Sequence, residues 1–204
     1  MGHNAPESLK ARLKSLSLES DNTKTHHSMT LNEILHSRRS CRRFTAEVPS
    51  REIIDSLLAE ALTAPSSKNT RSTRYIVVTD PATLETMSQM RDYGSALLKG
   101  APVGIIVCGD EQASDLWEVN CAISTTILQL AVEAKGLASC WVHIKDRPHL
   151  KDNPEAGNAE EWLRANVAGI PEGWRPLCVV AIGYPEAPAK PHSPKDDSDK
   201  VLYL

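Results

Sequence analysis

The sequence lacks the long apolar runs that mark membrane and exported proteins. No stretch reaches the roughly 18 to 20 apolar residues needed to span a bilayer, and the first residues contain no apolar core of a signal peptide. We therefore expect a soluble, cytoplasmic protein. With 204 residues, 41% of them hydrophobic, the chain has enough material for one core and little for a second domain.

Motifs for metals, nucleotides and hydrolytic nucleophiles are absent as well. The five cysteines contain no CxxC pair, so their spacing indicates no zinc or iron–sulfur site and is typical of reduced, mostly buried thiols. The chain has no GxGxxG, GxxxxGK[ST], GxSxG or HExxH. Because no acid, base, nucleophile or metal set stands out, a redox cofactor that brings its own chemistry is the most natural hypothesis.

Positive charge is concentrated in one short segment. Arg38, Arg39, Ser40, Cys41 and Arg42 place three guanidinium groups and a hydroxyl within five residues of a chain whose formal net charge is -3. Arginine presents a planar fork of donors that matches phosphate oxygens. The segment therefore predicts a site for a small phosphorylated ligand, and the alternative is a solvated basic surface loop.

Apolar periodicity and capping residues predict one α+β domain. Residues 1–28 read as a flexible N-terminal arm, residues 29–204 as the domain, and the chain from about residue 185 as a tail. We expect helices at 31–37, 51–62, 81–91, 115–135 and 155–167, and strands at 75–79, 102–110, 138–144 and 177–182. Thr30 and Glu33 predict a capping box, Asp80 and Pro81 an N-cap and a first helical residue, and Gly136 a left-handed helix end. Long helices mixed with few strands indicate a three-layer sandwich.

Two further polar segments are candidates for binding. The loop from Pro65 to Arg71 follows a predicted helix, and a tail segment carries Lys190, His192 and Lys195. Within the loop, the amide of Asn69 can both donate and accept, as the edge of a flavin or a nucleobase requires. The alternative for Asn69 is a turn-forming role.

Five sequence strings together resemble the nitroreductase family. They are RRSCRRF at 38–44, APSSKNTR at 64–71, GLASCWV at 136–142, GIPEG at 169–173 and VVAIGYPEAP at 179–188. Their order and spacing are similar to the family's from about Thr30 to the end of the chain. The resemblance implies an FMN-binding three-layer sandwich with a mostly antiparallel sheet, and an interlocked homodimer in which the tail wraps the partner and the flavin lies at the interface.

The resemblance also implies a reaction. NADH or NADPH would pass a hydride to flavin N5, and a nitroaromatic, a quinone or a similar flat acceptor would then be reduced in the same place. The protein would position the ring and stabilise its reduced form with amide donors and positive charge. No side chain is expected to act as an essential acid or base, and no metal is expected.

The matching positions imply which residues contact the FMN. Those expected at the phosphate and ribityl chain are Arg38, Arg39, Ser40 and Arg42, with His192 or Lys195 from the tail. Those expected from the partner subunit's loop are Pro65, Ser66 and Ser67, and those near the ring are Asn69, Arg71, Trp141, Val142 and His143. Trp141 to His143 would offer main-chain donors near N5.

Two of these positions differ from the family pattern. Arg71 stands where the family has glutamine, which changes the expected ring or substrate contact. Asn120, in the longest predicted helix, replaces an aspartate that short members often carry.

Other functions remain open at this point. The same fold serves azoline dehydrogenases, dehalogenases and a flavin-cleaving branch. A flavin-binding protein without turnover is a different class, and a nucleic-acid binder using Arg38 to Arg43 is a third.

Overall fold

A four-stranded antiparallel sheet lies at the centre of the molecule. The computed structural model describes residues 29–190, 192–193 and 196–204, so the predicted arm lies outside the described residues. The strands follow the order β1–β2–β6–β3, each paired antiparallel with its neighbours. Their bounds are Thr73–Val78 for β1, Val103–Asp110 for β2, Ala138–His143 for β3 and Trp174–Gly183 for β6.

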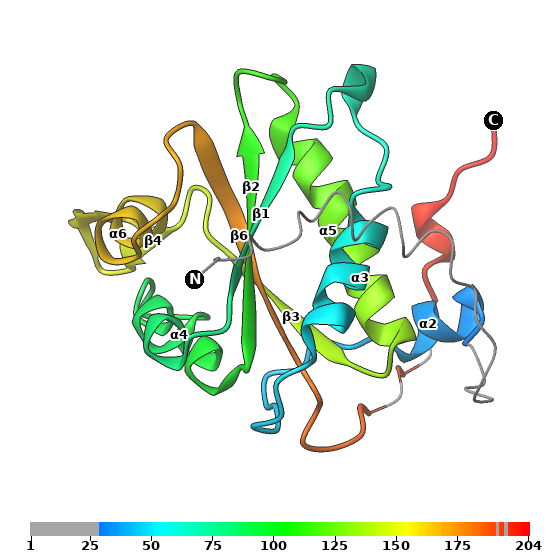
Figure 1. Ribbon diagram of the computed structural model, residues 1–204. Coiled ribbons are helices and arrows are strands. Elements are labelled where there is room, and N and C mark those ends of the chain that lie inside the picture. The colour runs from blue at the N-terminus through cyan, green and yellow to red at the C-terminus, as the bar shows by residue number, and fades with distance from the viewer. Residues whose placement is uncertain (1–28, 191, 194–195) are drawn as a thin grey trace, which may run out of the picture.

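Helices cover both faces of this sheet, which confirms the predicted three-layer sandwich (Figure 1). On one side lie α3 (Arg51–Ala61) and α5 (Trp117–Ala134), with α2 (Leu31–Ser37) beside them. On the other side lie α4 (Pro81–Ser88), the short helix η2 (Ala96–Gly100) and α6 (Ala159–Asn166). A hairpin of β4 (Pro148–Leu150) and β5 (Asn153–Asn158) packs next to α6.

The two central strands supply both cores because their side chains alternate between the faces. Ile106 and Val179 belong to the core under α4 and α6. Ile105 and Val180 belong to the core under α3 and α5. Burial on both sides explains why β2 reads as an almost uninterrupted apolar run in the sequence.

Local capping signals set the starts of α2 and α4 and the end of α5. Thr30 and Glu33 form a capping box at α2. At α4, Asp80 is the N-cap residue before Pro81, and its carboxylate accepts a hydrogen bond from the Thr83 amide. After α5, Gly136 has a φ of +71°, the left-handed conformation expected of a residue that ends a helix.

Two helix boundaries differ from the prediction. The helix expected at 155–167 begins only at Ala159, because Asn158 and Glu161 form a capping box there and residues 153–158 form β5. The helix expected to reach Arg91 ends at Ser88. The hydroxyl of the buried Ser95 donates to the carbonyls of Ser88 and Arg91, at 2.7 and 2.8 Å, and so satisfies the end of that helix.

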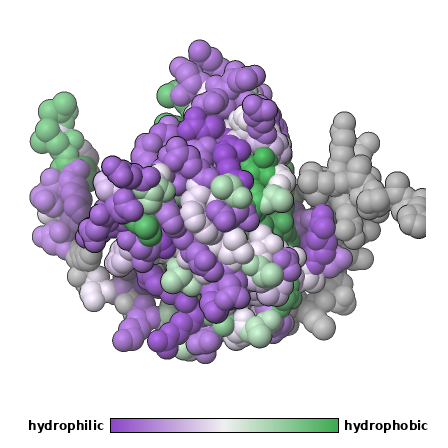
Figure 2. Space-filling view, turned by 90° about the vertical axis from the view of Figure 1, so that its left-hand side faces the viewer, coloured by the Kyte–Doolittle hydropathy of each residue, from purple (hydrophilic) through white to green (hydrophobic). Residues whose placement is uncertain are grey.

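The outer face over α4 and α6 is mostly hydrophilic, as Figure 2 shows. None of the described helices is both long and apolar enough to cross a membrane.

We predict that Gly109→Ala destabilises the fold. A Cβ at Gly109 in β2 would lie 2.2 Å from Cε3 of the buried Trp117, so the indole ring would have to move. Overpacking of this kind costs about 1 to 3 kcal/mol of the free energy of unfolding. Gly100→Ala is the matched control, because nothing lies within 4 Å of the added carbon. Chemical denaturation compares the two variants, and equal stabilities would contradict the prediction.

Candidate functional site

The arginine-rich segment lies along the outer edge of β3. Ser40 forms an isolated parallel bridge with Ser139, and the Cys41 amide donates to the Ser139 carbonyl over 2.9 Å. Because β3 is the last strand of the sheet, this is the side on which it has no neighbouring strand. The segment therefore begins to cover a sheet edge that is otherwise open.

Within this segment the arginines lie in different environments. Nη1 of Arg39 donates to the carbonyls of His36, Ser37 and Arg38 at 2.9, 3.1 and 2.8 Å, so it caps the end of α2. Arg42 is exposed and lines a cavity beyond the Ser40 bridge. Helix capping thus uses part of Arg39, whereas Arg42 faces open space.

We call this space the arginine cavity, and it has a volume of about 440 Å³. That size lies within the range of about 300 to 1,000 Å³ that is usual for small-molecule sites. Four predicted site residues line it, namely Arg42, Trp141, Val142 and His143. Two arginines from other segments, Arg91 and Arg147, line it as well, and none of the carboxylates in the described part of the chain does.

The edge of β3 turns main-chain groups toward this cavity. The Ser139 carbonyl points away from β6, because it accepts from Cys41. Alternation along an antiparallel strand gives Trp141 and His143 the same direction, and the His143 carbonyl accepts from Arg91 Nη1 over 3.0 Å. The amide N–H groups of Trp141 and His143 therefore lie on the open edge, whereas that of Val142, also expected as a donor, is directed toward β6.

The side chain of His143 is held by Trp141, which lies two residues earlier in β3. The indole N–H of Trp141 donates to His143 Nδ1 over 3.2 Å, and the two rings stack with centroids 6.1 Å apart. An accepting Nδ1 places the ring proton on Nε2. Burial lowers the pKa of His143 below its usual value, and the charges of Arg147 and Arg91 lower it further. The ring is consequently neutral near pH 7 and offers an Nε2–H donor.

A second cavity of about 400 Å³ adjoins the start of the segment. Arg39, Ser40 and Lys190 are among the residues that line it, and so is the carboxylate residue Glu133. The sequence predicted His192 or Lys195 as the cationic tail residue. His192 is exposed and does not line this cavity, and Lys195 lies outside the described residues. Lys190 is therefore the described tail cation that lies next to the segment.

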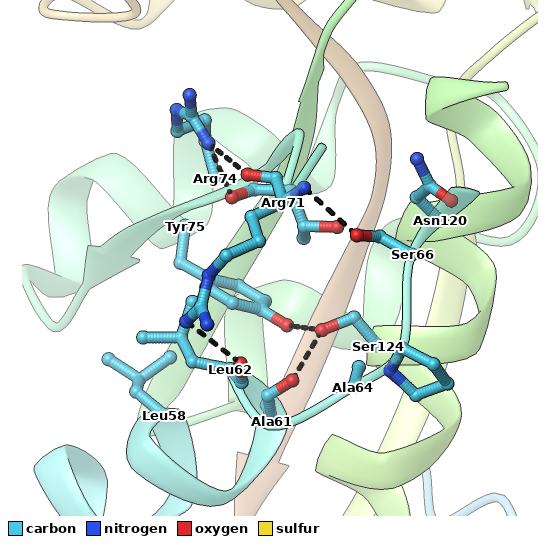
Figure 3. A pocket seen from close by; sticks show the side chains of 12 residues that line it. Leu58, Ala61, Leu62, Ala64, Ser66, Arg71, Arg74, Tyr75, Asn120 and Ser124 are labelled. Carbon is cyan, nitrogen blue, oxygen red and sulfur yellow. Dashed lines mark hydrogen bonds between the residues drawn. The ribbon is translucent and has the colours of Figure 1, made fainter. Parts of the chain in front are cut away.

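The loop at 65–71 lines a different pocket, of about 300 Å³, between α3, α5 and β1 (Figure 3). Tyr75 is central to this pocket, and its hydroxyl forms a short hydrogen bond with that of Ser124. Ser124 in turn donates to the Ala61 carbonyl over 2.6 Å. Burial raises the pKa of Tyr75 well above its usual value, so this phenol stays protonated.

Three residues of this loop have strained backbones. Lys68, Asn69 and Arg71 have φ of +51°, +53° and +49°, although none is a glycine. Such conformations persist only where the surroundings enforce them, and they are common at functional sites. Here the Ser66 hydroxyl accepts from the Arg71 amide over 2.9 Å. The Arg71 side chain runs across the pocket and donates to the Leu62 carbonyl over 3.3 Å (Figure 3).

Asn120 of α5 holds the loop at 65–71 in place through side-chain hydrogen bonds. Its side chain is only 2% exposed. Its Oδ1 accepts from the Ser67 amide over 2.9 Å, and its Nδ2 donates to the Ser72 hydroxyl, also over 2.9 Å. Longer bonds join Nδ2 to the hydroxyls of Ser114 and Thr70. Asn120 thus holds the loop in its strained shape.

Within one chain the predicted site residues fall into separate groups. Arg42, Trp141, Val142 and His143 share the arginine cavity, whereas Pro65, Ser66 and Arg71 line the Tyr75 pocket. Ser67 and Asn69 belong to the same loop as the second group. No described cavity contains both groups. This separation is what a site shared between two subunits requires.

Four residues near these groups were absent from the predicted site. They are Arg91, Asn120, Arg147 and Lys190. Lys190 belongs to a segment that the sequence did single out, and Asn120 was noted without a role. Arg91 and Arg147 gave no signal, because only the pairing of distant segments brings them to the cavity.

Comparison with known proteins gives consistent results. The model of the nitroreductase family matches residues 35–93 and 83–184. A protein of Methanothermobacter thermautotrophicus with the provisional name NADH dehydrogenase/NAD(P)H nitroreductase is 32% identical over 160 residues, 77% of this chain and 78% of the relative.

Solved structures match the chain in the same way. An FMN-dependent nitroreductase of Clostridium difficile has a TM-score of 0.74 at 32% identity and covers 84% of this chain and 96% of its own. A protein of Parabacteroides distasonis, provisionally named NADH dehydrogenase/NAD(P)H nitroreductase, has a TM-score of 0.75 at 28% identity, with 85% and 96% coverage. Fold and sequence therefore point to the same family.

We predict that Asn120→Ala loosens the loop. The Ser67 amide and the Ser72 hydroxyl would lose buried partners, at a cost of about 1 to 3 kcal/mol in unfolding free energy. Hydrogen exchange at the Ser67 amide should accelerate. Asn166→Ala is the matched control, because this helical asparagine is exposed and should cost less than about 0.5 kcal/mol. Unchanged exchange at Ser67 would contradict the role assigned to Asn120.

Proposed function

Since the chain belongs to the nitroreductase family, we propose that it is an FMN-dependent oxidoreductase that transfers a hydride from NAD(P)H to a flat acceptor such as a nitroaromatic compound or a quinone. The observation that carries this proposal is the open edge of β3, whose amide donors face a cavity that also contains Arg42. The FMN dependence and NAD(P)H use named for its relatives support the same choice.

The donor set suits FMN. A flavin ring presents nitrogen and carbonyl acceptors, which the N–H groups of Trp141 and His143 can meet along the strand edge. Its phosphate is a dianion, and Ser40 and Lys190 line the neighbouring cavity beside Arg39. None of the described carboxylates lines the arginine cavity, whereas Glu133 lines the neighbouring cavity together with Arg39 and Lys190.

In this proposal the protein binds and orients. FMN supplies the hydride chemistry when it is bound. Arg42 stabilises negative charge on the ring, and the main-chain donors of β3 fix the ring edge. Ser40 and Lys190 would hold the phosphate beside Arg39, and Arg38, which lines none of the cavities described above, stays a candidate from the sequence alone. No described side chain is needed as an acid or base, and the neutral His143 adds a fixed Nε2–H donor.

The site is proposed to be shared by two copies of the chain. The loop carrying Ser66 and Ser67 is proposed to reach the arginine cavity of a partner. Helix α5 offers a contact surface, because Leu116, Val119 and Ile123 form one apolar stripe at helical spacing and are all exposed. The exposed apolar end of the tail, residues 201–204, is proposed to extend this contact.

The cofactor proposal predicts a yellow protein that is bleached by nicotinamides. Freshly purified protein should show the visible absorbance of bound flavin, and anaerobic NADH or NADPH should remove it. Subsequent addition of a nitroaromatic compound or a quinone should restore it. A colourless protein that does not bind added FMN would contradict the proposal. Bound flavin that neither NADH nor NADPH reduces would favour a non-catalytic flavin-binding protein instead.

The shared-site proposal predicts that Val119→Glu separates the subunits and weakens FMN binding together. A charge placed in an apolar interface is costly, and we expect the dimer dissociation constant to rise by at least about tenfold. Val48→Glu is the matched control, because the two valines are 52% and 53% exposed. Sedimentation and flavin titration report the two effects. A monomeric variant that binds FMN as tightly as the unaltered chain would contradict a shared site.

A further inference from the structure

One rim of the arginine cavity is built from two segments that hydrogen bonds hold together. The Met90 carbonyl lies 2.9 Å from His149 Nδ1, and the Asp92 amide donates to the His149 carbonyl over 3.1 Å. The Asp92 carboxylate accepts from the Lys151 amide over 2.8 Å. The loop after α4 is thereby fixed against β4, and this rim presents Arg91 and Arg147 to the cavity.

Both arginines of the rim are positioned by main-chain contacts. Arg91 Nη1 donates to the His143 carbonyl, while the Arg91 Nε is buried and has no hydrogen-bond partner among the described residues. The Arg147 amide donates to the Ile144 carbonyl over 3.0 Å, and the Arg147 carbonyl accepts from Ala159 over 2.8 Å. Asp146, immediately before Arg147, has a φ of +55°. A strained turn therefore holds Arg147 at the cavity.

The rim brings two positive charges close enough to interact. Burial lowers the pKa of Arg91, the charge of Arg147 lowers it further, and the charge of Asp92 raises it, so the two guanidinium groups repel each other and Asp92 offsets part of that repulsion. The nearby carboxylates contact other groups. Asp146 and Glu118 both pair with Lys145, at 2.7 and 3.0 Å, and Asp92 accepts from a backbone amide. The charges of Arg147 and Arg91, which add to the effect of burial in lowering the pKa of His143, favour an anion in the cavity.

The proposed FMN contacts do not use this charge. They engage Arg42, the start of the arginine segment and the tail, whereas Arg91 and Arg147 come from other segments of the chain. Beside these two arginines the cavity is lined by Tyr93, Leu97 and Trp141. The ring of Tyr93 is 78% exposed, so it can lie against a flat ligand that enters the cavity.

We infer that Arg91 and Arg147 bind the carboxylate of an aromatic electron acceptor, so that the enzyme prefers anionic flat acceptors over neutral ones. A carboxylate matches the planar fork of a guanidinium group with two parallel hydrogen bonds. The aromatic ring of the same acceptor would lie against the apolar lining. This inference rests on the proposed function, because it names the class of acceptor for that reaction.

The test compares two acceptors of nearly the same shape, 4-nitrobenzoate and 4-nitrobenzamide. In the unaltered holoenzyme, kcat/KM should be at least about tenfold higher for the anion, the effect of a charge-assisted contact. Arg147→Gln should reduce this ratio by about tenfold, and Arg147→Lys, which keeps the charge without the fork, should reduce it less. Lys99→Gln is the control, because it removes the same charge from an exposed ion pair with Glu85. It should leave the ratio unchanged.

A binding measurement gives a second readout. Benzoate should bind the oxidised holoenzyme more tightly than benzamide, and Arg147→Gln should remove most of the difference. A ratio near one in the unaltered enzyme, or a ratio that Arg147→Gln does not change, would overturn the inference. So would a loss in Arg147→Gln that falls on NADPH relative to NADH, because the rim would then recognise the 2′-phosphate of the donor.

A failure of the proposed function can be distinguished from a failure of this inference. In that case neither acceptor would be turned over, and nicotinamides would not bleach the flavin absorbance. The benzoate titration on the protein as purified would still decide whether the rim binds a carboxylate.

Discussion

The open edge of β3 is the constraint on which the candidate site depends. A sheet edge presents N–H and C=O groups that must be paired, covered or solvated. Here Ser40 and Cys41 cover its start and Arg91 holds its end at the His143 carbonyl. Between these contacts the strand faces a cavity. Cys41 and Arg91, which are distant in sequence, converge here because each satisfies part of the same strand edge.

Helix α5 links the loop at 65–71 to the exposed apolar stripe. Asn120 lies on its buried side and holds the strained loop, while its neighbour Val119 lies on the exposed apolar stripe. Consecutive helical residues are about 100° apart around the axis, so one helix carries both contacts. In a dimer formed through this stripe, any shift of α5 would move the loop and the interface together. The rigidity of the loop would then help to set the geometry at the partner's cavity.

The sequence predicted those parts of the fold that depend on neighbouring residues. The capping box at Thr30, the Asp80–Pro81 start of α4 and the left-handed Gly136 involve contacts within a few positions, and all are confirmed. Strand β5 was missed because pairing with β4 stabilises it, and its own residues are polar.

The candidate site could likewise be predicted only where a short stretch of sequence carries the signal. Arg42 and Trp141 to His143 were found through the family resemblance, and the structure brings them into one cavity. Lys190, Arg91 and Arg147 depend on how the tail and two loops fold back on the strand edge. Charge alone did not distinguish these residues from the remaining surface arginines and lysines. Only three-dimensional pairing shows that two like charges are held close together against their repulsion, which makes the rim a candidate for recognition.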